Sequence, residues 1–338
     1  MPSQRELVMT RILLFEPAYQ RIKDRAPPLG ADDVLLLMSE DGTIWLDGKQ
    51  VSADDAAPEV GWPSVDLFRG KAGRDYFVAL LKSPSLKWVQ SSAAGFENPV
   101  FGQLVQKGAR LTNNHSQAVG MSEYVLWGVL DHLQRGPDRR AEQAAHKWQT
   151  HPFTEVSGSR WLVIGFGAIG QAVARRARAF DAHVTGVRRS PGDQDHADAM
   201  ATPDKIHDLL PDSGVVVLSS PLNAQTANMV DAAFLSRMKP GSVLVNVGRG
   251  GLVDEAALLA ALDAGTPAHA VLDVFQTEPL PEDSRFWDHP RVTLTPHASP
   301  VGSGLEARSD ALFVENLGRY LAGEPLLNEV APAEVLGG

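Results

Sequence analysis

The chain has 338 residues, 43% of them hydrophobic and 21% charged, and a formal net charge of -10 at pH 7. This composition is typical of a globular protein with two domains, and the negative charge disfavours nucleic acid or an anionic membrane as a partner. The chain has no cysteine, which excludes disulfides, thiolate catalysis and cysteine-based zinc sites. Residues 1–11 lack a signal-peptide core, and no apolar stretch approaches the ~20 residues that span a bilayer, so we expect a cytoplasmic protein without a metal site.

The first third of the chain is predicted to mix strands with irregular segments. Residues 39–63 are rich in Asp, Gly and Pro and predict loops and a hairpin. A helix is expected at 123–133, because its apolar residues fall on one face. Strands are expected at 11–15, 34–38, 86–90 and 109–112.

From residue 161 onward, continuous apolar runs alternate with helical patterns. Such runs are typical of parallel strands buried on both faces, and the alternation predicts a doubly wound α/β sheet. A further helix is expected at 305–321, where it can pack on the first domain. The predicted strands are 161–165, 182–187, 214–219, 242–247, 268–275 and 292–295, and the predicted helices between them are 169–180, 205–210, 232–238 and 255–264.

A glycine-rich turn, G-F-G-A-I-G, joins the first of these strands to the first helix. Gly165 permits a tight turn, Gly167 lets the backbone approach a pyrophosphate, and Gly170 lets the helix pack close to the sheet. The amides of Ala168 and Ile169 would then face the phosphate charge. The pattern predicts dinucleotide binding, and the alternative is a structural turn that binds nothing.

The second strand of this region ends in G-V-R-R-S-P. An NAD site usually has an acidic residue here for the adenosine ribose hydroxyls. Arg188 and Arg189 instead can pair with a 2′-phosphate, and we include the neighbouring Ser190 in the site. The sequence therefore predicts that NADPH is preferred over NADH, while two solvated loop arginines remain the alternative.

Three later motifs carry groups suited to reducing a 2-keto acid. Arg249 in N-V-G-R-G-G follows a strand, where its guanidinium can hold a carboxylate and contact the keto oxygen. His297 in T-P-H-A-S is the candidate general acid, and Glu278 in D-V-F-Q-T-E-P is positioned to accept a hydrogen bond from its ring. Taken singly, each could be a surface or capping residue, but their order after a dinucleotide turn favours catalysis.

With these motifs, and with S-P-L-N-A-Q-T, the chain resembles the D-isomer-specific 2-hydroxyacid dehydrogenase family. The resemblance implies that Arg249, Glu278 and His297 are catalytic, with Arg249 and His297 also binding substrate. It implies further cofactor contacts at Pro221, Thr226, Val247 and Asp273.

The resemblance also implies the domain plan and further substrate contacts. A Rossmann cofactor domain at 118–298 would be inserted into a smaller flavodoxin-like substrate domain made of 1–117 and 299–338, and the protein would be a homodimer. The early motif S-S-A-A-G-F-E is similar to the family's carboxylate loop, which implies that amides near Ala94 and Gly95 bind the substrate acid. An ordinary strand-end turn is the alternative for this motif.

The function expected from these features is reduction of a small 2-keto acid to a D-2-hydroxy acid by NADPH, with NADH as the alternative cofactor. Glyoxylate and hydroxypyruvate are reasonable substrates. Trp62, Ser64 and His115 are candidates for lining the pocket, although packing or loop roles are equally open. The competing reading is a dinucleotide-sensing, corepressor-like binding protein of the same fold.

Overall fold

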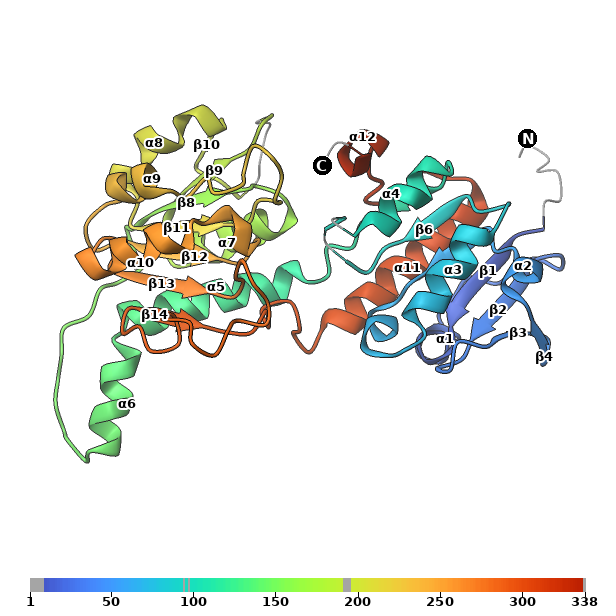
Figure 1. The fold of residues 1–338 in the computed structure, drawn as a ribbon, viewed down its shortest axis with the longest axis horizontal. Helices are drawn as coiled ribbons and strands as arrows, with labels where there is room; N and C mark the ends of the chain where they lie inside the picture. Colours follow the sequence, from blue (N-terminus) through green and yellow to red (C-terminus); the bar gives the residue numbers. More distant parts are fainter. Residues whose placement is uncertain (1–8, 94, 97, 191–195, 337–338) are drawn as a thin grey trace. The chain divides into compact units, whose positions relative to one another are not determined.

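The computed structural model describes residues 9–93, 95–96, 98–190 and 196–336. The chain divides into two compact units (Figure 1), one made of residues 1–116 with 304–338 and the other of residues 117–303. Each unit contains a seven-stranded sheet. The predicted α/β fold class is confirmed, and no described helix is long and apolar enough to cross a membrane.

The sheet of the first unit has the order β4-β3-β2-β1-β5-β6-β7. Strands β2, β1, β5, β6 and β7 are parallel, and their order is that of flavodoxin-like sheets. Strands β3 and β4 form the predicted antiparallel hairpin at one edge. The strands are β1 (Arg11–Phe15), β2 (Val34–Met38), β3 (Ile44–Leu46), β4 (Lys49–Val51), β5 (Val60–Trp62), β6 (Trp88–Gln90) and β7 (Arg110–Thr112).

Strand β5 corrects the sequence prediction, which assigned its residues to loops and a hairpin. It lies between β1 and β6, although it has three residues and a central glycine. The glycine is needed because a Cβ at Gly61 would lie 2.5 Å from the Leu80 side chain. So short a strand between two prolines shows no periodicity, which explains why the pattern was missed.

The last long helix completes the core of the first unit. Phe313 stacks on Trp62 with ring centroids 4.2 Å apart and on Trp88 at 5.9 Å, and both tryptophans are fully buried. The helices of this unit are α1 (Glu16–Ile22), α2 (Ala53–Ala56), α3 (Gly73–Lys82), α4 (Pro99–Gln106), α11 (Leu305–Ala322) and α12 (Pro332–Leu336), with the 3₁₀ turn η1 (Val65–Arg69).

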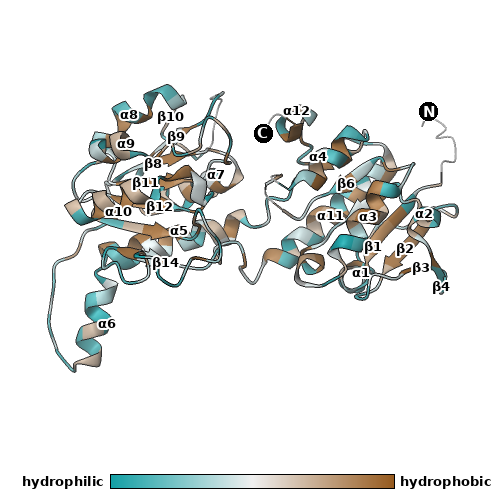
Figure 2. Ribbon diagram, in the orientation of Figure 1, coloured by the Kyte–Doolittle hydropathy of each residue, from teal (hydrophilic) through white to brown (hydrophobic). Residues whose placement is uncertain are grey.

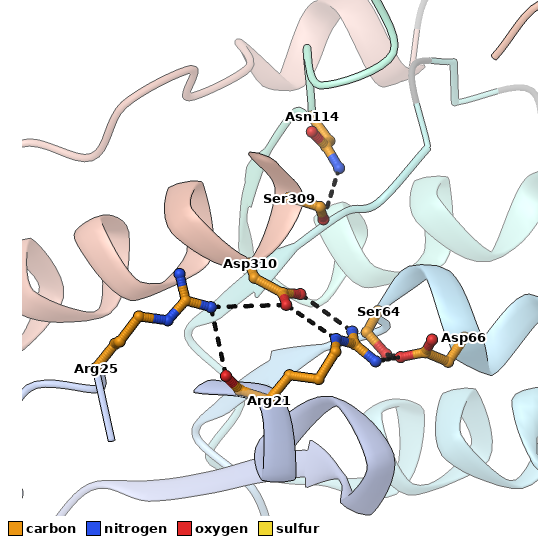
Figure 3. A network of polar contacts seen from close by, with 7 residues as sticks. All are labelled: Arg21, Arg25, Ser64, Asp66, Asn114, Ser309 and Asp310. Carbon is orange, nitrogen blue, oxygen red and sulfur yellow. Dashed lines mark hydrogen bonds and ion pairs between the residues drawn. The ribbon is translucent and has the colours of Figure 1, made fainter. Parts of the chain in front are cut away.

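An ionic network ties both ends of the chain together in this unit (Figure 3). Arg21 of α1 donates from Nε to Asp310 of α11 at 2.9 Å and from Nη1 to Asp66 of η1 at 2.6 Å. The Asp310 side chain is 3% exposed, so its charge depends on this partner. Hydrogen bonding to Asp310 raises the pKa of Arg21, which keeps the guanidinium charged.

The second unit has the strand order β10-β9-β8-β11-β12-β13-β14, and all its pairs are parallel. This is the doubly wound order, with the topological switch between β8 and β11. Strands β11, β12 and β13 are buried along their whole length. The strands are β8 (Arg160–Ile164), β9 (His183–Val187), β10 (Ala199–Ala201), β11 (Val215–Leu218), β12 (Val243–Asn246), β13 (His269–Leu272) and β14 (Val292–Leu294).

The helices of the second unit lie near the predicted positions, but helix α5 begins at Ala118, earlier than predicted, and α6 is an additional helix. Strand β10 is likewise absent from the prediction. Figure 2 shows why the strands were easier to find: β11 is hydrophobic, whereas α6 is largely hydrophilic. The helices are α5 (Ala118–Leu133), α6 (Gly136–Ala144), α7 (Ala168–Arg178), α8 (Ile206–Leu209), α9 (Ala232–Arg237) and α10 (Glu255–Ala264), with 3₁₀ turns η2 (Pro203–Lys205), η3 (Leu210–Asp212) and η4 (Gly250–Leu252).

Candidate active site

The glycine turn lies between β8 and α7, at the switch point of the sheet. Gly165 has φ +93°, and a Cβ there would lie 2.4 Å from the Ser220 nitrogen in the neighbouring loop. A Cβ at Gly170 would lie 2.4 Å from the Gly165 oxygen, whereas one at Gly167 would meet nothing within 4 Å. Two glycines are therefore required by packing, and the third leaves open space before the first helical residue, Ala168.

This open space fits a dinucleotide. No side chain caps the N-terminus of α7, where Ala168 and Ile169 lie, and the end of a helix of this length favours an anion. The absence of a side chain at Gly167 leaves room for a pyrophosphate to approach them.

The loop after β11 forms a second wall of this region. Its Pro221 is exposed, while Val247, after β12, is buried. The Thr226 hydroxyl donates to the Pro221 oxygen at 2.8 Å and accepts from the Asn223 nitrogen at 2.9 Å. Thr226 therefore closes this loop on itself.

Arg188 and Arg189 follow β9, and both side chains are exposed, as is Ser190. The backbone N–H of Arg188 donates to the Ala201 oxygen of β10 at 3.2 Å, which fixes the start of the loop. Within the described part of the chain neither guanidinium makes an ion pair with a carboxylate, so both remain open to an anionic ligand.

His297 and Glu278 form a hydrogen-bonded pair. His297 Nδ1 lies 2.8 Å from Glu278 Oε2, and the other oxygen, Oε1, accepts from the Phe275 nitrogen at 3.0 Å. The side chains are 42% and 37% exposed. The carboxylate is therefore held in place by backbone and orients the ring, while the imidazole stays accessible to a substrate.

Arg249 lies in the loop after β12, and that loop packs on the segment that carries Glu278. A Cβ at Gly250 would lie 1.9 Å from the Phe275 carbonyl carbon, so a side chain cannot be accommodated there. Arg249 is half-buried, and its Nη1 donates to the Gly248 oxygen at 2.8 Å. The contact between the two loops places the guanidinium and the His297–Glu278 pair at the carboxyl ends of the strands.

Asp273 is fully buried after β13 and organises the loop that carries His297. Its Oδ1 accepts from the Ala298 nitrogen at 2.7 Å and from the Thr295 hydroxyl at 2.6 Å, and its Oδ2 accepts from the Ser299 nitrogen at 3.0 Å. Thr295 is not among the residues predicted for the site, although it lies two positions before His297 in the motif T-P-H-A-S. Asp273 was predicted to contact the cofactor.

The remaining candidates lie in the first unit. Ala94 lies outside the described residues, and Gly95 is half-buried in the loop after β6. Trp62 and Ser64 are fully buried, and the stacking of Trp62 on Phe313 gives it a packing role. His115 is exposed after β7. Among the residues that the structure describes, no cluster of three potential metal ligands occurs.

Comparison with known proteins identifies the family of the chain. The family model for the D-isomer specific 2-hydroxyacid dehydrogenase NAD binding domain matches residues 126–299. A glyoxylate reductase of Thermococcus kodakarensis is 32% identical over 254 residues, which are 72% of this chain and 75% of that protein. A D-3-phosphoglycerate dehydrogenase of Mycobacterium bovis is 32% identical over 248 residues, 72% of this chain but only 47% of the relative's length.

Among solved structures, a D-isomer specific 2-hydroxyacid dehydrogenase from Xanthobacter autotrophicus Py2, in complex with NADPH and MES, is similar with a TM-score of 0.76 and 26% identity. The similarity covers 97% of this chain and 100% of that one. Motifs, fold and comparisons therefore agree that the chain belongs to the D-isomer specific 2-hydroxyacid dehydrogenase family, NAD(P)-dependent oxidoreductases that act on the CH–OH group of their substrates.

Proposed function

We propose that the protein reduces a small 2-keto acid, such as glyoxylate or hydroxypyruvate, to the D-2-hydroxy acid with NADPH. The observation that carries the proposal is the His297–Glu278 pair at 2.8 Å, at the sheet edge that also bears Arg249 and the glycine turn. A glyoxylate reductase among the relatives supports the substrate class.

Each residue of the set has a defined task. The nicotinamide cofactor, when bound, supplies the hydride. Arg249 binds the substrate carboxylate and polarises the keto group through its charge. His297 delivers a proton to the keto oxygen, and Glu278 orients the imidazole. In the first unit, the amides near Ala94 and Gly95 are proposed to bind the substrate acid.

The activity itself is tested by mixing the purified protein with NADPH and a panel of 2-keto acids while following absorbance at the nicotinamide band. We expect NADPH to be consumed with glyoxylate or hydroxypyruvate. Tight NADPH binding without consumption for any acid of the panel would instead support the dinucleotide-sensing alternative, because binding and turnover would then be separated.

The proposed cofactor preference rests on Arg188 and Arg189, which are exposed. Replacing both with alanine should lower kcat/KM for NADPH by about 10- to 100-fold, because charge-assisted contacts to the 2′-phosphate are lost. The same variant should keep its kcat/KM for NADH, which has no such phosphate. A higher kcat/KM for NADH than for NADPH in the unchanged protein would refute the preference.

We also propose a cytoplasmic homodimer that associates through the arm formed by α6 and residues 145–157. Helix α6 has no buried residue, and Figure 1 shows it standing away from the sheet of its unit. Trp148 is fully exposed and Phe153 is 46% exposed. Aromatic side chains gathered on one projection are typical of an interaction site.

Sedimentation velocity of the protein and of Trp148→Ser tests the dimer. We expect a dimer for the unchanged protein and a shift toward monomer for the variant. Trp287→Ser is the matched control, since Trp287 is 47% exposed in the same unit but outside the arm. A monomeric unchanged protein would contradict the proposal.

A further inference from the structure

Beyond the pair that is proposed to do the chemistry, a hydrogen-bonded chain reaches the His297 loop from a distant helix. The side-chain oxygens of Tyr124 and Thr295 are 2.8 Å apart, and the Thr295 hydroxyl is 2.6 Å from Asp273 Oδ1. Tyr124 belongs to α5, which is separated from Thr295 by 171 positions in the sequence. All three residues lie in the second unit.

Both hydrogen bonds come from the Thr295 hydroxyl, which donates to Asp273 Oδ1 at 2.6 Å and to the Tyr124 hydroxyl oxygen at 2.8 Å. Asp273 also accepts from the backbone N–H groups of Ala298 and Ser299. Thr295 therefore connects Tyr124 to the carboxylate that holds the loop. Burial raises the pKa of Tyr124 to about 12, so the phenol stays neutral.

The loop that receives these contacts holds His297 in an uncommon conformation. His297 has φ +51°, in the left-handed region that most residues avoid. Its backbone N–H donates to the carbonyl oxygen of Asp273 at 2.8 Å and to the carbonyl oxygen of Thr295 at 3.0 Å. Thr295 and Asp273, which are hydrogen-bonded to each other and to Tyr124 through Thr295, thus also fix the backbone of His297.

We propose that Tyr124 and Thr295 are positioning residues that, through Asp273, hold the His297 loop in its active conformation. The inference rests on the proposed function, and it assigns to Asp273 a task in shaping the loop in addition to any contact with the cofactor. Neither Tyr124 nor Thr295 contributes a group to the reaction, so their loss should lower turnover without lowering the affinity for NADPH.

Three variants test the chain of hydrogen bonds. Thr295→Val keeps the shape of the side chain but removes the hydroxyl, and we expect kcat to fall about tenfold or more. Thr295→Ser keeps the hydroxyl and should retain kcat to within about threefold. Tyr124→Phe keeps the ring and removes the hydroxyl that Thr295 contacts, so kcat should fall about threefold to tenfold. The dissociation constant of NADPH should stay within about twofold in all three.

The coupling of the two positions gives the sharpest readout. In the Thr295→Val background, Tyr124→Phe should have no further effect on kcat, because the hydroxyl that hydrogen-bonds to Tyr124 is already gone. Independent losses at the two sites, or equal losses for Thr295→Val and Thr295→Ser, would overturn the proposal. If Thr295→Val does not fold, full activity of Tyr124→Phe overturns it alone.

A second measurement keeps this inference separate from the proposed function. The ring resonances of His297 in NMR spectra should shift in Thr295→Val and Tyr124→Phe but not in Thr295→Ser, and this readout needs no turnover. A protein inactive on every keto acid but with these shifts would refute the proposed function and keep the positioning role. An active protein whose variants leave the His297 resonances unshifted would support the proposed function and refute the positioning role.

Discussion

His297→Ala is expected to lower kcat for keto-acid reduction by about a thousandfold, the range that loss of a general acid produces. The dissociation constant of NADPH should change little, since the glycine turn and the loop of Arg188 are separate segments. The measurements are steady-state kinetics with saturating NADPH and a fluorescence titration of the cofactor. Near-normal turnover in this variant would remove His297 from the mechanism.

A second substitution separates loss of the imidazole from strain in the loop. His297 has φ +51°, a conformation that alanine avoids and that asparagine tolerates better. An equal loss of kcat in His297→Ala and His297→Asn would assign the effect to the missing ring. His183→Ala is the matched control, since His183 lies near a carboxylate, Asp198, but at the start of β9. It should leave kcat unchanged.

Arg249→Ala is expected to lower kcat/KM for the keto acid by about a hundredfold to a thousandfold, because an uncompensated carboxylate in the site is costly. Arg249→Lys should fall between the two, as lysine keeps the charge but cannot form two parallel hydrogen bonds. Substrate-dependence curves for each variant measure both parameters. Raised KM should accompany the lower kcat if Arg249 binds substrate as well as the reacting state.

Arg237→Ala serves as the control for this series, since Arg237 is an exposed arginine at the end of α9 in the same unit. It should match the unchanged protein in kcat/KM. A loss of less than tenfold in Arg249→Ala would show that another group binds the carboxylate.

The three candidate motifs could be found because each comes soon after a strand that the apolar pattern predicts. Arg249 comes after β12, whose residues are all buried, and the carboxyl ends of parallel strands meet at one edge where ligands bind. The relation between Glu278 and His297 follows in the same way, because β13 and β14 are neighbours in the sheet. A strand that is recognisable in the sequence therefore also indicates where the residues that follow it lie in the sheet.

What could not be predicted depends on contacts across long sequence separations. In the sequence, Tyr124 is one of many residues of a predicted helix. Its hydroxyl lies next to Thr295, 171 positions later, only in the folded structure. Strands β5, Val-Gly-Trp, and β10, Ala-Met-Ala, are not part of a longer apolar run, so no hydrophobic pattern marks them. Helix α6 has no buried residue, so no row of large apolar side chains marks it in the sequence.

The aromatic stack of the first unit has a consequence for the order in which a growing polypeptide folds. Trp62 and Trp88 emerge from the ribosome long before Phe313, which covers them, and the whole of the 117–303 unit is made in between. The first unit therefore has all its strands by residue 112, but its apolar rings stay uncovered until α11 has been made. Nascent chains that stall before α11 should then be the ones that engage chaperones, despite already holding a finished dinucleotide fold.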